Sequence, residues 1–203
     1  DSRTLGPGSL FVAISGERFN GHRFVGEALG SGACGVVVSE RSAVPPAATQ
    51  TAIVIHVADT TRALQALSQS VRRRSGAKVV AVTGSAGKTT TKEVAAELLA
   101  TRYRVFRTKG NFNNHIGLPL SLLELRDGPD IAVVELGMSH AGEIRMLVGL
   151  AEPDVRVWTN VGEAHIGHFG SADLIADAKA EIGEGANAST VLVANADDSR
   201  VMA

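Results

Sequence analysis

The stretch that decides the fold class is VVAVTGSAGKTTTKEVAAELL, residues 79–99. Its first residues are apolar and predict a buried strand, and its last residues have the spacing of an amphipathic helix. Between them lies a glycine-rich turn followed by a lysine and three threonines. Where a strand turns directly into a helix, free backbone N–H groups and the positive end of the helix dipole can hold an anion. The stretch therefore predicts an α/β protein with a phosphate-binding loop.

The loop departs from the commonest phosphate-binding pattern, G-x-x-x-x-G-K-[ST]. Counting back from Lys88, that pattern needs a glycine at the position of Val82, whereas the glycine stands at Gly84. A plain strand–helix turn would explain the glycines, but not a lysine followed by three residues of poor helix propensity. Lys88 can place a charge on the outer phosphates, and the Thr89 hydroxyl can ligate Mg²⁺. The predicted ATP-binding residues are Thr83, Gly84, Ser85, Ala86, Gly87, Lys88, Thr89 and Thr90.

Outward from this loop, short apolar runs alternate with helical patterns, which predicts parallel α/β sheets. We expect two domains, 1–76 and 77–203, with the boundary at Gly76. The expected strands span 9–14, 35–39, 52–57, 78–82, 104–107, 130–137, 155–161 and 190–195. The expected helices span 22–32, 60–76, 88–102, 117–125, 142–150 and 171–184. Because the chain starts with Asp1 and stops just after a strand-like segment, we expect a fragment with both ends cut.

The composition of the chain argues against two classes of partner, nucleic acids and membranes. The 203 residues are 44% hydrophobic and carry a net charge of −1, which is typical of a globular protein with no general attraction to nucleic acid or anionic membranes. No apolar run approaches the roughly 18 residues of a membrane span, and no signal peptide is visible. We therefore expect no nucleic-acid partner and no membrane insertion.

Two local features receive ordinary structural interpretations. Cys34, the single cysteine, cannot form an internal disulfide, which fits a reducing compartment, and we expect it to be buried. The run 72–74, three arginines before Ser75 and Gly76, is typical of a helix C-terminus, and we interpret these charges as solvated rather than as a nucleic-acid patch.

The loop TGSAGKTT, residues 83–90, resembles the ATP-binding loop of the Mur ligase superfamily, T-G-x-x-G-K-[ST], which also occurs in folylpolyglutamate synthases. This shorter pattern accounts for Val82. The segment KGNFNNHIGLPLSLLEL, residues 109–125, resembles the G-N-x-N-N-x-I-G-x-P signature of the superfamily members that add D-alanyl-D-alanine to UDP-N-acetylmuramoyl-tripeptide.

The asparagines Asn111, Asn113 and Asn114 precede a predicted helix, where amide groups and the helix dipole could cradle a carboxylate or peptide, although an Asn-rich turn is the alternative. Residues 1–29 resemble the first domain of the muramyl-peptide ligases, which implies a uridine-nucleotide site containing Ser2 and Arg3. The resemblance also adds Asn160 to the substrate-binding set.

Candidate metal ligands lie at or shortly after the carboxyl ends of predicted strands. Glu135 ends an apolar strand, where α/β sheets place ligand sites, and its carboxylate suits a hard cation. The family motif E-[LM]-G implies that Glu135 binds Mg²⁺ with Thr89. The family pattern T-N-[VL]-x-x-[AE]-H implies that His165 binds a second Mg²⁺. The resemblance of ADAKAEIG, residues 176–183, to the family segment with a carbamylated lysine points to Lys179, whose carbamate oxygens could ligate a metal.

The letters HIGH at 165–168 also mark class I aminoacyl-tRNA synthetases, but here they follow a phosphate loop that those enzymes lack, and we interpret them as coincidence. A zinc site at the same two histidines lacks further ligands at suitable spacing.

The resemblance implies an ATP-dependent ligase of bacterial peptidoglycan synthesis, and so of cell-wall biogenesis and cell division. ATP phosphorylates the tripeptide carboxylate, and the amine of D-alanyl-D-alanine then attacks the acyl phosphate. The implied catalytic residues are Lys88, His165 and Lys179, with two Mg²⁺ ions. A cytoplasmic monomer is expected. Because the family has a third domain, we expect residues 1–203 alone to be inactive.

Three alternatives stay open: another ligase of the superfamily that adds a diamino acid or glutamate, an NTPase that drives conformational change, and a nucleotide-binding module without catalysis.

Overall fold

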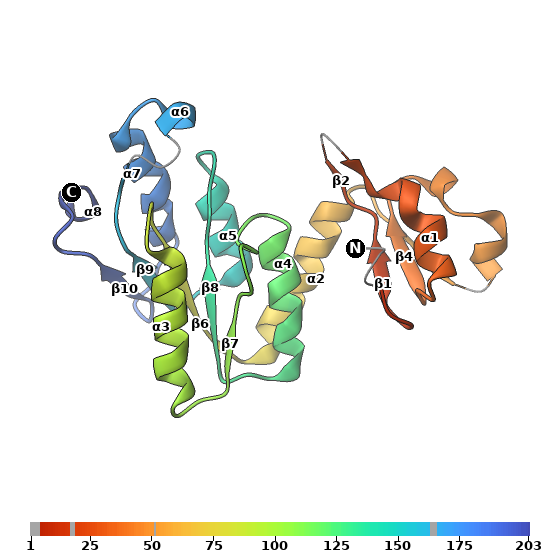
Figure 1. Ribbon diagram of the computed structural model, residues 1–203, viewed down its shortest axis with the longest axis horizontal. Helices are drawn as coiled ribbons and strands as arrows, with labels where there is room; N and C mark the ends of the chain where they lie inside the picture. The colour runs from red at the N-terminus through yellow and green to blue at the C-terminus, as the bar shows by residue number, and fades with distance from the viewer. Residues whose placement is uncertain (1–4, 17–18, 51, 163–165) are drawn as a thin grey trace. The chain divides into compact units, whose positions relative to one another are not determined.

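The structure, a computed structural model, describes residues 5–16, 19–50, 52–162 and 166–203. The chain divides into two compact units, Asp1–Leu64 and Gln65–Ala203 (Figure 1). The division falls inside helix α2 (Thr60–Ser75), earlier than the boundary that we expected at Gly76. The later turns of α2 belong to the second unit, where Val71 packs against the main core. The domain boundary at Gly76 therefore stays a prediction.

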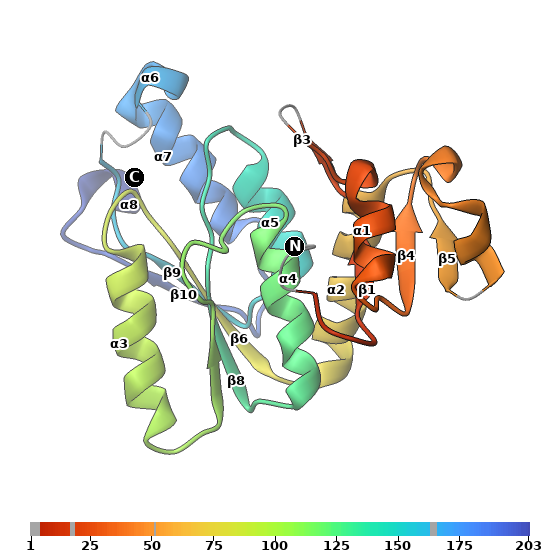
Figure 2. The same cartoon turned by 45° about the vertical axis from the view of Figure 1, so that its right-hand side comes forward.

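The first unit contains a parallel sheet in the order β1-β4-β5, as the alternating pattern predicted. Figure 2 shows α1 beside β1 and β4. Val25 and Ala28 of α1 pack with Val36 and Val38 of β4. A two-stranded antiparallel hairpin precedes α1 and was not predicted, because strands of two residues have no measurable periodicity. The elements are β1 (Leu10–Val12), β2 (Ser15–Gly16), β3 (Phe19–Asn20), η2 (Gly21–Phe24), α1 (Val25–Gly30), β4 (Gly35–Val38), η3 (Arg41–Ala43), η4 (Pro46–Gln50) and β5 (Ile53–His56).

The second unit is built on a five-stranded parallel sheet in the order β10-β9-β6-β8-β7. Strand β6 is central, so the loop that follows it opens at the middle of the carboxyl edge, where α/β sheets bind ligands. The strands are β6 (Lys78–Thr83), β7 (Val105–Arg107), β8 (Ile131–Glu135), β9 (Val155–Trp158) and β10 (Val191–Ala194). The helices are α3 (Lys88–Ala100), α4 (Gly117–Leu123), η5 (Glu124–Asp127), α5 (Glu143–Ala151), α6 (Ile166–Phe169), α7 (Ala172–Ala180), η6 (Glu181–Gly183) and α8 (Ser199–Met202).

Helices cover both faces of this sheet. Along β6, Val80 and Val82 pack with Ala96 of α3, whereas Val79 and Ala81 belong to the larger core formed with α4, α5 and α7. Figure 1 shows α3 on one side of β7 and β8 and α4 on the other. Both faces of β6 are therefore buried, which explains why its sequence is a continuous apolar run rather than an alternating one. The predicted α/β class with parallel sheets is confirmed. In the described parts of the chain no helix is long and apolar enough to cross a membrane.

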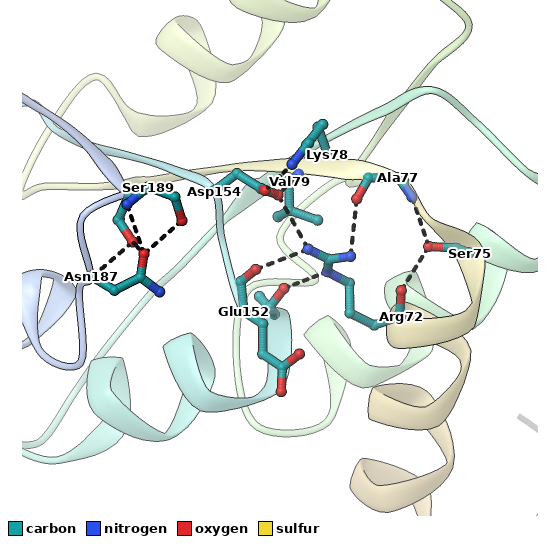
Figure 3. Close-up of polar contacts among 11 residues, drawn as sticks. Arg72, Ser75, Ala77, Lys78, Val79, Glu152, Asp154, Asn187 and Ser189 are labelled. Atoms are coloured by element: carbon teal, nitrogen blue, oxygen red, sulfur yellow. Dashed lines mark hydrogen bonds and ion pairs between the residues drawn. The ribbon is translucent and has the colours of Figure 1, made fainter.

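The interpretation of Arg72 as a solvated charge was wrong. Arg72 is only 8% exposed, and its guanidinium donates hydrogen bonds to the carbonyl oxygens of Ala77, Ala151 and Glu152, at 3.0, 2.7 and 2.9 Å (Figure 3). It also forms an ion pair with Asp154, at 3.3 Å. The carbonyl groups at the end of α5 need donors, and the rigid fork of an arginine can satisfy several of them at once. Of the three consecutive arginines at 72–74, Arg73 and Arg74 are exposed and Arg72 is buried.

The expectation that Cys34 is buried was also wrong. The cysteine is exposed, with its thiol donating to the carbonyl oxygen of Gly8 at 3.1 Å. Cys34 lies in the turn before β4, and the first buried position of that strand is Gly35. A Cβ on Gly35 would lie 2.6 Å from the carbonyl oxygen of Ile53, so the strand approaches β5 too closely for a side chain there.

Candidate active site

The loop between β6 and α3 depends on two glycines with positive φ, Gly84 at 151° and Gly87 at 77°. Gly87 is the N-cap residue of α3, with no side-chain cap. The Thr83 hydroxyl donates to the carbonyl oxygen of Leu136 at 3.0 Å and so joins the end of β6 to the segment after β8. The loop therefore presents the uncapped start of a 13-residue helix beside the carboxyl ends of two strands.

The segment after β9 holds this loop in place. The Asn160 side chain accepts from the Ala86 N–H at 2.8 Å and donates to the Ala86 carbonyl oxygen at 3.1 Å. The Thr159 hydroxyl donates to the same carbonyl at 2.8 Å, and the Ser85 N–H donates to the Asn160 carbonyl at 3.0 Å. Both the oxygen and the nitrogen of the Asn160 side-chain amide are thus hydrogen-bonded to the loop. Contact between Asn160 and a substrate stays a prediction.

Lys88 and Lys179 come from distant parts of the chain and line the same cavity. The Lys88 ammonium donates to the carbonyl oxygen of Gly84 at 2.9 Å, so it lies over the loop. Lys179 on α7 is 2% exposed. Burial, together with the charge of Lys88, lowers the pKa of Lys179 to about 8. A buried amine of this kind is neutral far more often than an ordinary lysine, and only a neutral amine is a nucleophile.

Glu135 ends β8 directly beside the loop, because the sheet register pairs it with Val82. The Glu135 residue is 3% exposed. One of its oxygens, Oε2, accepts from the Thr89 hydroxyl at 2.8 Å, and Oε1 accepts from the Asn113 amide at 2.8 Å. The predicted proximity of Thr89 and Glu135 is therefore present, and it links the first turn of α3 to the end of β8.

The three asparagines of the predicted cradle do different things. Asn113 donates to Glu135. The Asn114 side chain accepts from the N–H groups of Ile116 and Gly117, at 3.1 and 2.8 Å, and so begins α4. Asn111 is exposed. Part of the Asn-rich pattern thus serves the local turn, which was the alternative interpretation, and substrate contacts of Asn111, Asn113 and Asn114 remain predictions.

A cavity of about 380 Å³ opens beside these groups. Its lining residues are Lys88, Asn113, Asn114, His115, Gly137, Met138, Ser139, His140, Glu143 and Lys179. The lining residues that were not predicted as site residues are His115, Gly137, Met138, Ser139, His140 and Glu143. The available signal was the position of Glu143 in the first turn of a helix, where an acidic residue is favoured. Its carboxylate accepts from the N–H groups of Ser139 and His140, at 2.5 and 3.2 Å, and so shapes the wall of the cavity.

Glu181 was also missed. It is 5% exposed, and it accepts from the N–H groups of Gly142 and Arg145 at 2.6 and 3.0 Å. These contacts join the start of α5 to the end of α7, two residues after Lys179. Glu181 therefore fixes the part of α7 from which Lys179 extends.

Three predicted site residues, Ser2, Arg3 and His165, lie outside the residues that the structure describes. Within the described ranges, no group of three or more His, Cys, Asp or Glu side chains converges on a common point. The donor set of Thr89 and Glu135 nevertheless suits Mg²⁺, because nucleotide sites commonly hold this ion with one or two protein oxygens plus the phosphates.

The parallel sheet, the glycine loop at its centre and the carboxylate beside that loop define an α/β protein whose central loop has the geometry of a phosphate-binding loop. The chain belongs to the Mur ligase family: the Mur ligase middle domain matches residues 82–203, and the catalytic domain of the Mur ligase family matches residues 1–72. The resemblance inferred from the sequence is confirmed.

Comparisons with individual proteins also identify Mur ligases as the relatives of this chain. The UDP-N-acetylmuramoyl-tripeptide–D-alanyl-D-alanine ligase of Bacillus subtilis is 46% identical over 198 residues, covering 98% of this chain and 43% of the relative. A crystal structure of MurF from Acinetobacter baumannii superimposes with a TM-score of 0.90 at 38% identity, covering 98% of this chain and 43% of that one. The MurF ligase of Thermotoga maritima in complex with ADP gives a TM-score of 0.83 at 36% identity, covering 95% and 44%. The chain thus spans less than half the length of these relatives.

Proposed function

We propose that this chain carries the uridine-nucleotide-binding and ATP-binding parts of a ligase that joins D-alanyl-D-alanine to UDP-N-acetylmuramoyl-tripeptide in peptidoglycan precursor synthesis. One observation carries the proposal. Lys88 and Lys179 line one cavity, while Thr89 and Glu135 are hydrogen-bonded beside it. Relatives that share this chain's sequence along almost its full length are named for that ligase reaction, and one of them was crystallised with ADP.

The reaction has two steps. A carboxylate oxygen of the tripeptide forms a bond to the γ-phosphorus of ATP, and the bond to the bridging oxygen breaks, which releases ADP. The amine of D-alanyl-D-alanine then attacks the acyl carbon, phosphate departs, and the amine loses a proton. Activation is needed because a free carboxylate has no leaving group that an amine can displace.

The residues of the loop act by positioning and by charge. Backbone N–H groups from Gly87 to Thr90, at the uncapped start of α3, bind the phosphates. Lys88 offsets the negative charge that develops on the transferred group, and Asn160 keeps the loop rigid. Thr89 and Glu135 hold Mg²⁺, which supplies further neutralisation of the phosphate charge when bound. We assign His165 to a second Mg²⁺, and Ser2, Arg3, Asn111 and Asn114 to the muramyl substrate.

Lys179 is assigned as the site of a carbamate. Its neutral amine adds to CO₂ and releases one proton, and the product bears one negative charge that two oxygens beside Lys88 share. The Lys88 charge, which disfavours the ammonium form of Lys179, favours the carbamate form. Incubation with ¹³CO₂ and ¹³C NMR test this assignment: a carbamate signal that vanishes in Lys179→Met supports it, and identical spectra contradict it. The whole enzyme is assigned as a cytoplasmic monomer.

Nucleotide binding tests the central claim. We expect residues 1–203 to bind ADP with Mg²⁺ in titration calorimetry, and Lys88→Ala to weaken that binding. Lys109→Ala is the matched control, because Lys109 is exposed and, within the described residues, its ammonium pairs with Glu124 alone, at 3.4 Å. Equal loss in the two variants, or no binding by the wild-type chain, would contradict the proposal.

Phosphate release distinguishes the reaction. The complete ligase should release phosphate from ATP only when both UDP-N-acetylmuramoyl-tripeptide and D-alanyl-D-alanine are present, and residues 1–203 alone should form no amide. Steady ATP hydrolysis without a muramyl substrate would instead indicate an NTPase.

A further inference from the structure

Asn113 is held against the segment that follows β8. Its backbone carbonyl accepts from the Gly137 N–H at 2.8 Å, and its own N–H donates to the Asn111 carbonyl at 2.8 Å. These two bonds fix the backbone on both sides of the side chain. Asn113 is therefore anchored to the residue that lies two positions after Glu135, before any side-chain contact is considered.

The side-chain amide of Asn113 lies directly over Gly137. A Cβ added to Gly137 would lie 2.8 Å from Cγ, 2.9 Å from Oδ1 and 3.0 Å from Nδ2 of Asn113. All three distances are shorter than or at the limit of real Cβ contacts, and the φ angle of Gly137 is not in the left-handed region. The absence of a side chain at this position is thus required by the approach of Asn113 rather than by backbone conformation.

Because Gly137 has no side chain, the Asn113 amide can lie over it and reach the Glu135 carboxylate. The Asn113 amide donates to Oε1 and the Thr89 hydroxyl donates to Oε2, so the carboxylate is held from both sides. A carboxylate has about four lone-pair positions, of which these bonds use two. Among the described side chains no lysine, arginine or histidine forms an ion pair with Glu135. A buried carboxylate with only neutral donors still favours a cation.

We propose that Asn113 is a positioning residue for the divalent cation. It fixes the orientation of the Glu135 carboxylate from one side, with Thr89 on the other, so that the remaining lone pairs are available to the metal. The sequence suggested that Asn113 contacts the peptide substrate. We assign it instead to Glu135, so that it acts on the cation through that carboxylate and does not bind the cation itself. The inference rests on the proposed function, because the cation is the one that accompanies the ATP phosphates.

The experiment measures Mn²⁺, a paramagnetic substitute for Mg²⁺, bound to the chain with ADP by electron paramagnetic resonance. We expect Asn113→Ala and Asn113→Leu to bind Mn²⁺ about 10-fold more weakly, as is typical when the partner of a metal ligand is removed. Leucine is branched at the same carbon and fills the same space without an N–H donor. Gly137→Ala should give a loss in the same direction by displacing Asn113. ADP affinity without metal should stay unchanged in all three variants.

Two controls separate this role from a general structural one. Asn187→Ala removes an exposed amide that bonds only within its own loop, and Gly149→Ala adds a Cβ where nothing lies within 4 Å. Both should leave Mn²⁺ binding as in the wild type. Melting temperature is recorded for every variant. In a Glu135→Gln background, Asn113→Leu should cause no further loss, because the two residues act through one contact.

Retention of wild-type Mn²⁺ affinity by Asn113→Leu, with loss in Glu135→Gln, would overturn the role of Asn113 and leave the proposed function standing. Additive losses in the double variant would likewise overturn it. A wild-type chain that binds neither ADP nor Mn²⁺ would overturn the proposed function and this inference together.

Discussion

The hydroxyl oxygen of Thr159 lies 1.9 Å from the position that a Cβ on Gly84 would occupy. The loop after β6 and the segment after β9 therefore meet at a point where only glycine fits. The φ angle of 151° at Gly84 adds a second restriction, since side chains rarely adopt that conformation. The first glycine of the loop is thus required by the segment after β9 as well as by the turn.

Gly84→Ala is expected to distort the loop, because the methyl group must displace Thr159, whose hydroxyl bonds to the Ala86 carbonyl. We expect ADP affinity to fall at least about 10-fold and stability by about 1–3 kcal/mol, the usual cost of local backbone strain. Titration calorimetry and thermal unfolding measure the two effects. Gly149→Ala serves as the matched control, and equal ADP affinity in Gly84→Ala and wild type would show that the contact can relax without consequence.

Arg72→Met is expected to destabilise the second unit by about 3 kcal/mol or more. The substitution leaves the carbonyls of Ala77, Ala151 and Glu152 without their buried donor, and each unsatisfied group costs roughly 1–3 kcal/mol. Urea unfolding followed by the fluorescence of Trp158, the single tryptophan, reports on this unit. Arg74→Ala, at an exposed neighbour, should change stability by less than about 0.5 kcal/mol. Similar losses for both variants would refute the buried role of Arg72.

Low pH should weaken the buried network around Arg72, because it protonates Asp154, the ion-pair partner of Arg72. Burial alone would raise the pKa of this carboxyl group, but hydrogen bonds from Lys78 and from the Val79 N–H, with the charge of Arg72, lower the pKa below its ordinary 3.8. A lowered folded-state pKa contributes stability above the unfolded pKa, and this contribution is lost as pH falls through the folded one. The free energy of unfolding should therefore decrease as pH falls below about 4.

Asp154→Asn provides the comparison for this acid effect. The variant should be less stable than wild type at neutral pH, and its stability should depend less steeply on pH in the acidic range, as measured by urea unfolding at several pH values. Parallel curves for the two proteins would assign the acid dependence to other carboxylates.

Glu181→Gln is expected to loosen the junction between α5 and α7. The carboxylate accepts from two N–H groups at the start of α5, and a neutral amide loses the interaction with the helix dipole and one of the acceptors. A loss of about 1–2 kcal/mol follows from the usual strength of hydrogen bonds to charged groups. Glu184→Gln removes only an exposed pairing with Arg145 and should cost less. The reverse order in urea unfolding would contradict the assignment.

Much of the fold could be predicted from local patterns. The continuous apolar run of β6 and the glycines of the loop appear in consecutive residues, and their structures follow from the chain itself. The position of Glu135 at the end of β8 was likewise predicted, because a strand's polar terminal residue is visible in the sequence. The parallel arrangement followed from the alternation of strands and helices, which leaves few other topologies.

The partners of polar side chains could not be predicted in this way. Asn113, Asn114 and Asn160 have identical side chains, yet one bonds to Glu135, one begins a helix and one holds the loop. An amide can donate and accept, so its role depends on which groups the fold brings within about 3 Å. The same holds for Arg72, whose sequence neighbours indicated a solvated helix end.

By itself, the sequence determined that a glycine-rich loop with a lysine joins an apolar strand to a helix, because periodicity, glycines and a lysine are properties of consecutive residues. Val82, which breaks the commoner spacing, became a mark of the family for the same reason. Only the tertiary structure decided that Lys179 is buried beside Lys88 and that Asn113 reaches Glu135 across Gly137. These contacts join segments far apart in the chain, and their distances depend on how the strands and helices pack, which no local pattern encodes.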